Sequence, residues 1–379
     1  MLKIGITGQA GFVGTHMYNT LGLYPDKFLR IPFKDAFFQE ENSLKSFVSQ
    51  CDIIVHLAAM NRHNDPKVIY NTNLKLVQQV ISACELTTSI PHIIFSSSTQ
   101  EERDNLYGKS KKEGRSLFEK WAERNNAQFT GLIIPNVYGP FGLPYYNSVV
   151  ATFCHQLSHH EQPKIEVDGE MKLIYVGELV KIILEIIEKS DKEHQKGVII
   201  QQIKVQHTSE VRVSHLLQLL ERYKTNYFEK GEIPDLDNPI NRNLFNTFLC
   251  YIDHLTFFPF KLVKNTDNRG SFVEIIKLNS GGQVSFSTTI SGIIRGNHFH
   301  TRKAERFAVI KGKARVEIRR IGTEKVLRFE LDGNQPSFVD MPIWYTHNII
   351  NIGEEDLYTL FWISEHFNAE DPDTWLEKV

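Results

Sequence analysis

Residues 1–14, MLKIGITGQAGFVG, decide the fold of the first half of the chain. The apolar segment Lys3–Thr7 predicts a β-strand, and the residues from Gly14 onward predict a helix. Gly8, Gly11 and Gly14 form a G-x-x-G-x-x-G loop between them. Glycines let backbone N–H groups and a helix N-terminus approach a pyrophosphate closely. A glycine triplet alone is a weak signal, but this position predicts a dinucleotide site.

Strand-like and helix-like segments alternate through the first half of the chain. The apolar runs Asp52–Leu57 and His92–Ser96 lack internal alternation, which is typical of strands buried on both faces. Helices are predicted over Asn71–Cys84 and from about Lys109 to Glu123. This order predicts an α/β domain over residues 1–256, with a doubly wound parallel sheet of the Rossmann type.

After about residue 255 the pattern changes to short strands separated by glycines. Little of this region is helical, so a β-sandwich or a small barrel is expected over residues 257–379. The segment Phe257–Lys261 holds a proline among aromatic residues and is interpreted as a linker. The predicted strands are Phe272–Leu278, Gln283–Thr289, Arg306–Ile310, Ala314–Arg319 and Val326–Leu331.

Composition excludes several classes of partner. The formal net charge of -2 provides no electrostatic footprint for nucleic acid or an anionic membrane. The four cysteines have no paired spacing, so neither a disulfide framework nor a CxxC metal site is expected. The chain shows no leader peptide pattern and no apolar run long enough to span a bilayer. A cytoplasmic protein is therefore expected.

Tyr107 and Lys111 form a Y-x-x-x-K pair on one face of a predicted helix. The chain holds 13 tyrosines, so roughly one such pair is expected by chance. The pair gains weight because it follows a strand ending in serines that include Ser97 and Ser98. A serine hydroxyl can orient a carbonyl and a tyrosine can protonate its oxygen, while a lysine cation lowers the tyrosine pKa. Either serine fits this role.

The segment Phe28–Lys34 contains Arg30 and Lys34 near the end of the second strand of the fold, where a dinucleotide-binding domain recognises the ribose. An acidic residue there would favour NADH, whereas two cations suit the 2′-phosphate of NADPH. A solvated pair of surface cations is the alternative.

The second half contains a metal-ligand pattern. Gly292, His298, His300, Glu305 and Gly312 fit G-x5-H-x-H-x4-E-x6-G, the first motif of the cupin family. Downstream, Pro342, His347 and Asn351 fit the second motif P-x-G-x-x-H-x3-N, with Trp344 in place of its glycine. Three imidazoles and a carboxylate suit zinc, iron, nickel or manganese. His298, His300, Glu305 and His347 are the predicted ligands, and histidines kept only for packing are the alternative.

The first half resembles the extended short-chain dehydrogenase/reductase family, whose members act mostly on nucleotide sugars. The residues that carry the resemblance are Gly8–Gly14, Asp52–Ala59, Ser96–Ser98, Tyr107–Lys111 and Pro135–Gly139. The resemblance implies that Ala58 and Ala59 lie along the cofactor, with Pro135 and Asn136 near the nicotinamide. Thr99 and Gln100 stand where the family's 4,6-dehydratases carry Asp-Glu, which favours plain carbonyl reduction.

The fusion of a carbonyl reductase to a metal cupin favours one ketone substrate for both domains. In a 4-keto sugar the C3 hydrogen is acidic, and a metal at the C4 oxygen stabilises the enolate, so C3 can be epimerised before C4 is reduced. The whole chain resembles the bifunctional capsular-polysaccharide enzymes of the CapF type. That resemblance implies that a zinc cupin epimerises C3 of a UDP-2-acetamido-2,6-dideoxy-4-keto-hexose. The reductase would then use NADPH to reduce C4 and give a UDP-N-acetyl-6-deoxytalose. This product would be a precursor of UDP-N-acetyl-L-fucosamine.

The resemblance also makes Asn147 a candidate substrate contact, although a structural loop asparagine is equally compatible with its position. A homodimer is expected because the barrel offers sheet surfaces for self-association. Two alternatives remain open at this point. The cupin could be a sugar-binding or dimerisation module beside a single ketoreductase or epimerase activity, or it could be an iron site that uses oxygen.

Overall fold

The computed structural model describes residues 1–193, 199–268 and 270–379. The chain forms two compact units that are not continuous in sequence. The first unit comprises Met1–Tyr138, Tyr145–Ser148 and Glu170–Val211, and the second comprises Gly139–Pro144, Val149–Gly169 and Arg212–Val379. These units do not meet at residues 256 and 257, where the sequence predicts a domain boundary. Whether residues 1–256 and 257–379 fold independently stays a prediction.

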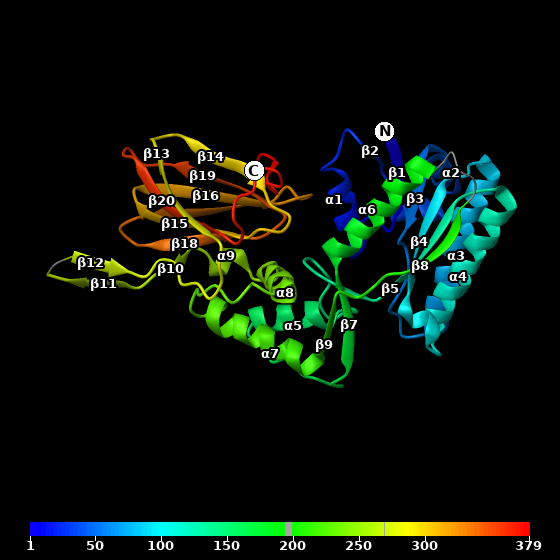
Figure 1. Ribbon diagram of the computed structural model, residues 1–379, viewed down its shortest axis with the longest axis horizontal. Helices are drawn as coiled ribbons and strands as arrows, with labels where there is room; N and C mark the ends of the chain where they lie inside the picture. Colours follow the sequence, from blue (N-terminus) through cyan, green and yellow to red (C-terminus); the bar gives the residue numbers. More distant parts are fainter. Residues whose placement is uncertain (194–198, 269) are drawn as a thin grey trace. The chain divides into compact units, whose positions relative to one another are not determined.

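The first unit is built on a six-stranded parallel sheet in the order β2-β1-β3-β4-β5-β8 (Figure 1). Every residue of β3 and β5 is buried, which explains why their sequences lack alternation. The doubly wound parallel sheet predicted for this region is confirmed. The strands are β1 Leu2–Thr7, β2 Phe28–Ile31, β3 Ile53–His56, β4 His92–Ser98, β5 Phe129–Ile134 and β8 Ile200–Lys204.

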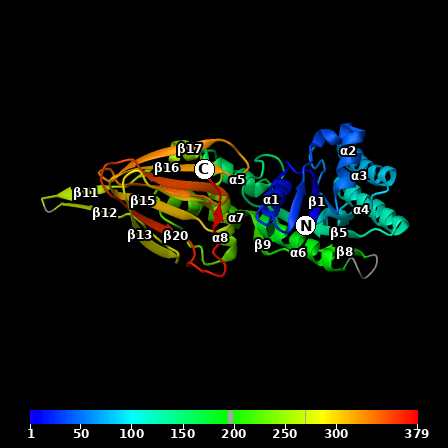
Figure 2. The same ribbon diagram turned by 90° about the horizontal axis from the view of Figure 1, so that it is seen from above.

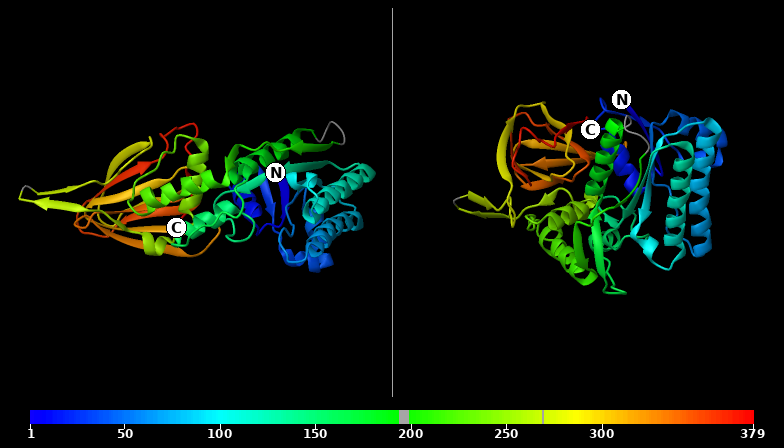
Figure 3. Two further views of the ribbon diagram at one scale, coloured as in Figure 1. Left: turned by 90° about the horizontal axis from the view of Figure 1, so that it is seen from below. Right: turned by 45° about the vertical axis from the view of Figure 1, so that its right-hand side comes forward.

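Helices cover both faces of this sheet, as Figure 3 also shows. Helices α1 (Phe12–Leu21) and α6 (Val176–Glu193) pack on one face. Helices α2 (Glu41–Gln50), α3 (Pro66–Thr87) and α4 (Leu106–Asn125) pack on the other. The remaining elements of this region are the 3-10 helices η1 (Asp35–Gln39) and η2 (Thr99–Glu102) and a sheet of β6 (Asn136–Tyr138), β7 (Glu170–Tyr175) and β9 (Ser209–Arg212).

The second unit combines a group of helices with a β region. The sequence analysis made no prediction for the helical elements. They are α5 Val149–Ser158, α7 Val213–Tyr223, the π-helical turn η3 Lys224–Phe228, α8 Pro239–Leu249 and α9 His254–Phe257. Helices α5, α7 and α8 pack against one another. Phe258 is buried in the core of the β region, and β10 (Phe260–Lys261) pairs with a strand of that region. Phe257 and Phe260 pack against the same core, whereas Lys261 is exposed, so the interpretation of Phe257–Lys261 as a linker was wrong.

The β region contains two five-stranded antiparallel sheets that share one apolar core (Figure 2). The β15 sheet has the order β10-β18-β15-β20-β13, and the β16 sheet has the order β17-β16-β19-β14-β21. The strands are β13 Gln283–Thr289, β14 Ile294–Phe299, β15 Glu305–Lys311, β16 Lys313–Arg320, β17 Val326–Asp332, β18 Ser337–Met341, β19 Tyr345–Asn351, β20 Leu357–Ile363 and β21 Trp375–Leu376.

The expectation of a mostly β second half is confirmed, whereas a cupin barrel stays a prediction. The strand expected over Phe272–Leu278 ends early, because β12 covers Gly270–Val273 and pairs with β11 (Lys264–Asp267) in a separate hairpin. Within the part of the chain that the structure describes, no helix is long and apolar enough to cross a membrane.

A buried ion pair joins the helical group to the β region inside the second unit. Arg306 on β15 contacts both carboxylate oxygens of Asp340 on β18, with N···O distances of 2.8 and 2.9 Å. Arg306 also donates to the carbonyl of Gly231, and Tyr227 in η3 donates to Asp340 at 2.7 Å. Because each charge has partners, the pair is tolerated in the interior, but removing one member leaves the other charge unpaired.

We therefore expect Asp340→Ala to lower the free energy of unfolding by about 3–5 kcal/mol, because Arg306 would stay buried without its counter-charge. Urea denaturation measures this. The control is Asp371→Ala, which removes a solvent-exposed partner of Arg302 and should cost about 1 kcal/mol or less. Equal losses in the two variants would contradict a special role for the buried pair.

Candidate active and metal sites

The glycine loop is closely packed in the way that the sequence predicts. Gly8 has a φ of +71°, and a Cβ at this position would lie 2.8 Å from the backbone nitrogen of Ala58. A Cβ on Gly14 would lie 2.1 Å from the carbonyl oxygen of Gly8. Gly11 precedes α1 and has no side chain to cap the first N–H groups of the helix. These N–H groups remain available to an anionic ligand.

The loop after β3 brings Ala58 to the glycine loop. Because β1 and β3 are parallel neighbours, their carboxyl ends meet at one edge of the sheet. Ala59 follows in the same loop and is partly exposed. The structure therefore brings Ala58 against Gly8 of the glycine loop, and the place of these residues along a dinucleotide stays a prediction.

The two cations predicted to select NADPH are placed differently. The Arg30 guanidinium donates to the carbonyl of Tyr18 at 3.1 Å and lies over the Tyr18 ring, so it is held against α1. Lys34 is exposed and follows Phe33, whose N–H donates to the side chain of Gln9 in the glycine loop. The prediction of an NADPH preference therefore rests on Lys34 more than on Arg30.

Tyr107 and Lys111 lie in the first turns of α4. The Asn105 side chain accepts from the N–H of Gly108 at 2.7 Å and caps this helix. The Lys111 ammonium is buried, donates to the carbonyl of Ser96 at 2.9 Å and lies 5.9 Å from the centre of the Tyr107 ring. The structure thus brings the end of β4 and the Y-x-x-x-K pair together.

Burial controls the protonation of this pair. It lowers the pKa of Lys111 to about 8, although the Glu101 carboxylate opposes the shift. Burial, together with the nearby Tyr146, raises the pKa of Tyr107 to about 12. The expectation that Lys111 brings the Tyr107 pKa toward neutrality is therefore wrong for this structure, because desolvation disfavours the phenolate. At neutral pH the phenol keeps its proton and the ammonium its charge.

The two candidate serines have different surroundings. The Ser97 hydroxyl donates to the Glu101 carboxylate, which Arg115 also binds with both its Nε and Nη2 atoms at 3.1 and 2.9 Å. Ser98 ends β4 and caps η2, and its Oγ accepts from the N–H of Gln100 at 3.2 Å. As an acceptor in this bond, the Ser98 hydroxyl keeps its proton for a ligand, whereas Ser97 uses its proton within the protein.

The segment Tyr145–Ser148 of the first unit is held by the loop after β3. Arg62 donates to the carbonyl oxygens of Tyr145 and Tyr146, the latter at 2.7 Å, and Asn147 donates to the carbonyl of Asn61 at 3.1 Å. Asn147 therefore has a structural contact, and its role toward a substrate stays a prediction. Sequence analysis missed Arg62, since a lone arginine in a loop carries no local signal.

Pro135 lies between β5 and β6, and Asn136 belongs to β6. Pro135 is buried, and Asn136 is exposed as the first residue of β6. Their expected position beside a nicotinamide stays a prediction.

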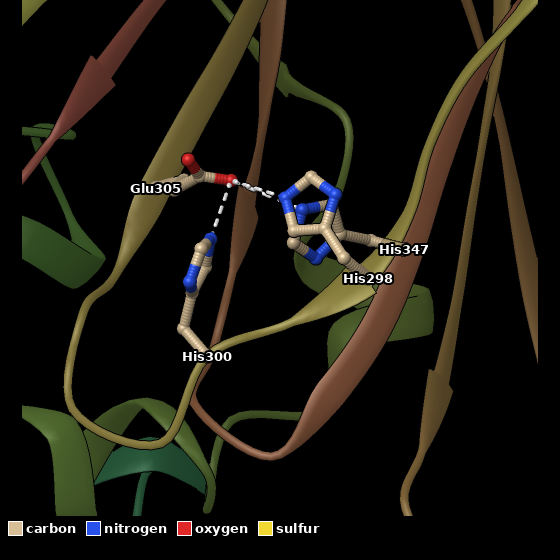
Figure 4. Close-up of side chains that lie close together, drawn as sticks. All are labelled: His298, His300, Glu305 and His347. Atoms are coloured by element: carbon tan, nitrogen blue, oxygen red, sulfur yellow. Dashed lines mark ion pairs between the residues drawn. The ribbon is translucent and has the colours of Figure 1, made fainter. Parts of the chain in front are cut away.

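Four predicted metal ligands converge in the β region (Figure 4). Glu305 begins β15, His298 and His300 come from β14 and the residue after it, and His347 is on β19. The Nε2 atoms of His347, His300 and His298 lie 3.0, 3.4 and 4.0 Å from Oε2 of Glu305. One ligand atom from each residue lies within 4.8 Å of every other.

The donor atoms of this cluster fit a divalent metal ion. Among the described residues, the buried atoms Nε2 of His300, Oε2 of Glu305 and Nε2 of His347 have no hydrogen-bond partner. Leaving such atoms unsatisfied is costly, and a metal ion would satisfy all of them. Burial raises the pKa of Glu305, but its contacts with His300 and His347 outweigh this and lower it. Burial lowers the pKa of His298 to about 4, so this ring is neutral, as a ligand must be.

The second metal motif keeps its turn despite the missing glycine. Trp344 has a φ of +62°, the left-handed region that glycine usually occupies, and its N–H donates to the carbonyl of His300 at 2.8 Å. Its ring packs against Phe299. The turn therefore tolerates a side chain, as the sequence analysis requires.

Asp340, whose side chain is bound by Arg306, points to the face of the sheet opposite Glu305.

Comparisons with known proteins agree with this geometry. Residues 4–200 match the NAD dependent epimerase/dehydratase family, and residues 265–375 match the polysaccharide biosynthesis C-terminal domain. The UDP-2-acetamido-2,6-beta-L-arabino-hexul-4-ose reductase of Pseudomonas aeruginosa is 29% identical over 379 residues, covering 99% of this chain and 98% of that protein. The crystal structure of the capsular polysaccharide assembling protein CapF from Staphylococcus aureus is 32% identical, with a TM-score of 0.61 and 100% of both chains covered.

A third likeness concerns the fold alone. The UDP-glucose 4-epimerase of Thermotoga maritima is 20% identical, with a TM-score of 0.51, covering 59% of this chain and 83% of that one. The chain therefore belongs to the NAD dependent epimerase/dehydratase family, as a CapF-like capsular polysaccharide protein.

We expect Gly14→Ala to weaken NADPH binding about tenfold or more, because the new Cβ would press on the Gly8 carbonyl and displace the loop from a pyrophosphate. Fluorescence titration measures the affinity. The control is Gly169→Ala, because among the described residues nothing lies within 4 Å of a Cβ at that position. Unchanged affinity in Gly14→Ala would remove this loop from the cofactor site.

The Lys111 ammonium is expected to contact the cofactor ribose, so the affinity for NAD(P)H should fall as the pH rises through about 8, where this group loses its proton. Well above that pH, affinity that depends on the charged form falls about tenfold per pH unit. The KM for NADPH, measured on both sides of this pH, tests the prediction. Lys111→Arg keeps its charge and should flatten the profile, whereas the exposed Lys112→Arg should not. A KM that does not change with pH in the wild type would contradict a role of the Lys111 charge in cofactor binding.

Proposed function

We propose that this protein is a bifunctional UDP-sugar enzyme of surface-polysaccharide biosynthesis that acts in the cytoplasm. Its β region epimerises C3 of a UDP-2-acetamido-2,6-dideoxy-4-keto-hexose, and its Rossmann-type unit then reduces the C4 ketone to a UDP-N-acetyl-6-deoxytalose. The observation that carries the proposal is the presence, in one chain, of a Tyr107–Lys111 pair and a buried three-histidine, one-carboxylate cluster. The name of the full-length Pseudomonas aeruginosa relative supports the 4-keto sugar.

In the reductive step the protein supplies a proton and holds the reactants. NADPH, when bound, supplies the hydride. Tyr107, which keeps its proton at neutral pH, donates it to the C4 oxygen, and the Ser98 hydroxyl orients that oxygen. Lys111 holds the cofactor ribose while its ammonium stays anchored on Ser96. Gly8, Gly11 and Gly14 admit the pyrophosphate.

In the epimerising step His298, His300, Glu305 and His347 would hold a divalent metal, which we take to be zinc because of the resemblance to the CapF-type enzymes. When bound, the metal withdraws electron density from the C4 carbonyl and makes the C3 hydrogen more acidic. The side chain of His298 is 21% exposed, whereas the other three are at most 8% exposed. The substrate would therefore approach from the His298 side.

The chemistry fixes the order of the two steps. Reduction of C4 removes the carbonyl that makes C3 acidic, so epimerisation comes first. A homodimer, expected from the sequence, is part of the same proposal.

The deciding experiment follows the C3 proton by NMR in heavy water and then the oxidation of added NADPH. Tyr107→Phe should slow reduction about 10²–10⁴-fold, because it removes the general acid, and should leave C3 exchange intact. His298→Asn should abolish C3 exchange and leave reduction intact. Continued exchange in this variant without bound metal would discredit the four-residue cluster as the epimerising site. Tyr24→Phe and His215→Asn, which alter an exposed tyrosine and an exposed histidine, are the matched controls.

Each alternative has its own signature in this experiment. Reduction without C3 exchange would leave a simple ketoreductase and make the β region a binding or dimerisation module. Redox-active iron together with oxygen consumption on substrate addition would favour an oxygen-using site. If neither C3 exchange nor reduction is observed, the proposed substrate is contradicted.

A further inference from the structure

The C-terminal segment Asp371–Trp375 lies against the loop that joins the ligand-bearing strands β14 and β15. In this loop Arg302 contacts Asp371 at 2.9 Å, and the buried Lys303 ammonium donates to the carbonyl of Pro372 at 2.5 Å. Strand β21 then pairs with β14 next to His298. The segment therefore covers the connection between three of the four cluster residues.

Asp373 makes the central contacts of this segment. Its buried carboxylate accepts from the N–H of Thr301 at 3.1 Å, the hydroxyl of Thr301 at 2.6 Å, the N–H of Arg302 at 3.0 Å and the indole N–H of Trp375 at 3.3 Å. Two of these donors are the backbone groups that directly follow His300. Hydrogen bonds to a carboxylate are stronger than neutral ones, so they fix this turn of the backbone.

The backbone of Asp373 also fixes the His300 ring. Its carbonyl oxygen contacts Nδ1 of His300, and a carbonyl only accepts, so Nδ1 must carry the proton. In the neutral ring that a metal ligand requires, Nε2 is then the nitrogen with the free lone pair. This is the atom that lies 3.4 Å from Glu305 and is buried, among the described residues, without a hydrogen-bond partner. One residue thus sets both the path of the loop and the tautomer of a candidate ligand.

We propose that Asp373 is a positioning residue of the metal site, which holds His300 with Nε2 presented to a divalent cation. The inference rests on the proposed function only in taking the four-residue cluster as a metal site. Groups that orient a ligand histidine in this way typically contribute 10–100-fold to metal affinity.

The variant Asp373→Asn tests this role with little change of shape. Asp373 has a φ of +43°, and asparagine tolerates this left-handed conformation as well as aspartate does. The amide keeps one acceptor oxygen but loses the charge and replaces the other oxygen with a donor, which opposes the N–H groups of Thr301 and Arg302. The fold should therefore survive while the turn after His300 loosens.

The experiment uses the full chain and two metal probes. Competition with a chromophoric chelator gives the zinc affinity, and the visible spectrum of the cobalt-substituted protein reports ligand geometry. The melting temperature of the metal-free protein separates positioning from folding. We expect Asp373→Asn to bind zinc about 10–100-fold more weakly, with an altered cobalt spectrum and a metal-free melting temperature close to that of the wild type.

The matched control is Asp371→Asn, which removes a carboxylate of the same segment from Arg302 but leaves the Asp373 contacts. It should bind zinc like the wild type. Three results would overturn the inference: unchanged zinc affinity in Asp373→Asn, equal weakening in both variants, or weakening matched by a large fall in metal-free melting temperature. Wild-type protein that binds neither metal would overturn the metal site itself, which is a separate failure.

Discussion

A buried carboxylate sets the strictest constraint on the β region. Glu305 lies in the interior among three imidazoles, and an isolated carboxylate in such a place would be very costly. Among the described residues, Oε2 of Glu305 and the Nε2 atoms of His300 and His347 have no hydrogen-bond partner, and a cation between them would satisfy all three. The strands that carry the four side chains must therefore keep their register, and the surrounding loops must be held firmly. This explains why so many polar contacts converge on the turn after His300.

The two sites use burial in different ways. In the Rossmann-type unit, burial removes water from Lys111 and Tyr107 and moves their pKa values apart, lowering that of Lys111 and raising that of Tyr107. The phenol remains a proton donor over the physiological range, and the ammonium remains close to its titration point. In the β region, burial keeps His298 neutral and so keeps its lone pair available. The same physical effect thus favours proton donation in one place and cation binding in the other.

Sequence reasoning succeeded where local pattern and covalent geometry decide the structure. Gly8 and Gly14 are needed because a Cβ would strike the backbone, and fixed spacing brought His298, His300 and Glu305 together. It failed where contacts between segments far apart in the sequence determine the structure. No local pattern indicates that Arg62 holds the segment Tyr145–Ser148, or that Phe258 belongs to the β core. The direction in which the Tyr107 pKa shifts also depends on how deeply the ring is buried, and the spacing of Tyr107 and Lys111 gives no information about burial.

The chain passes between its two units at residues 138/139, 144/145, 148/149, 169/170 and 211/212. Neither unit is therefore one continuous stretch of the gene. A recombination event that joined a new C-terminal piece at residue 257 would separate Arg306 and Asp340 from Tyr227 and Gly231, their partners upstream. Substitutions on the helical side of this buried contact therefore have to be compatible with those on the sheet side, so the two sides cannot vary independently of each other.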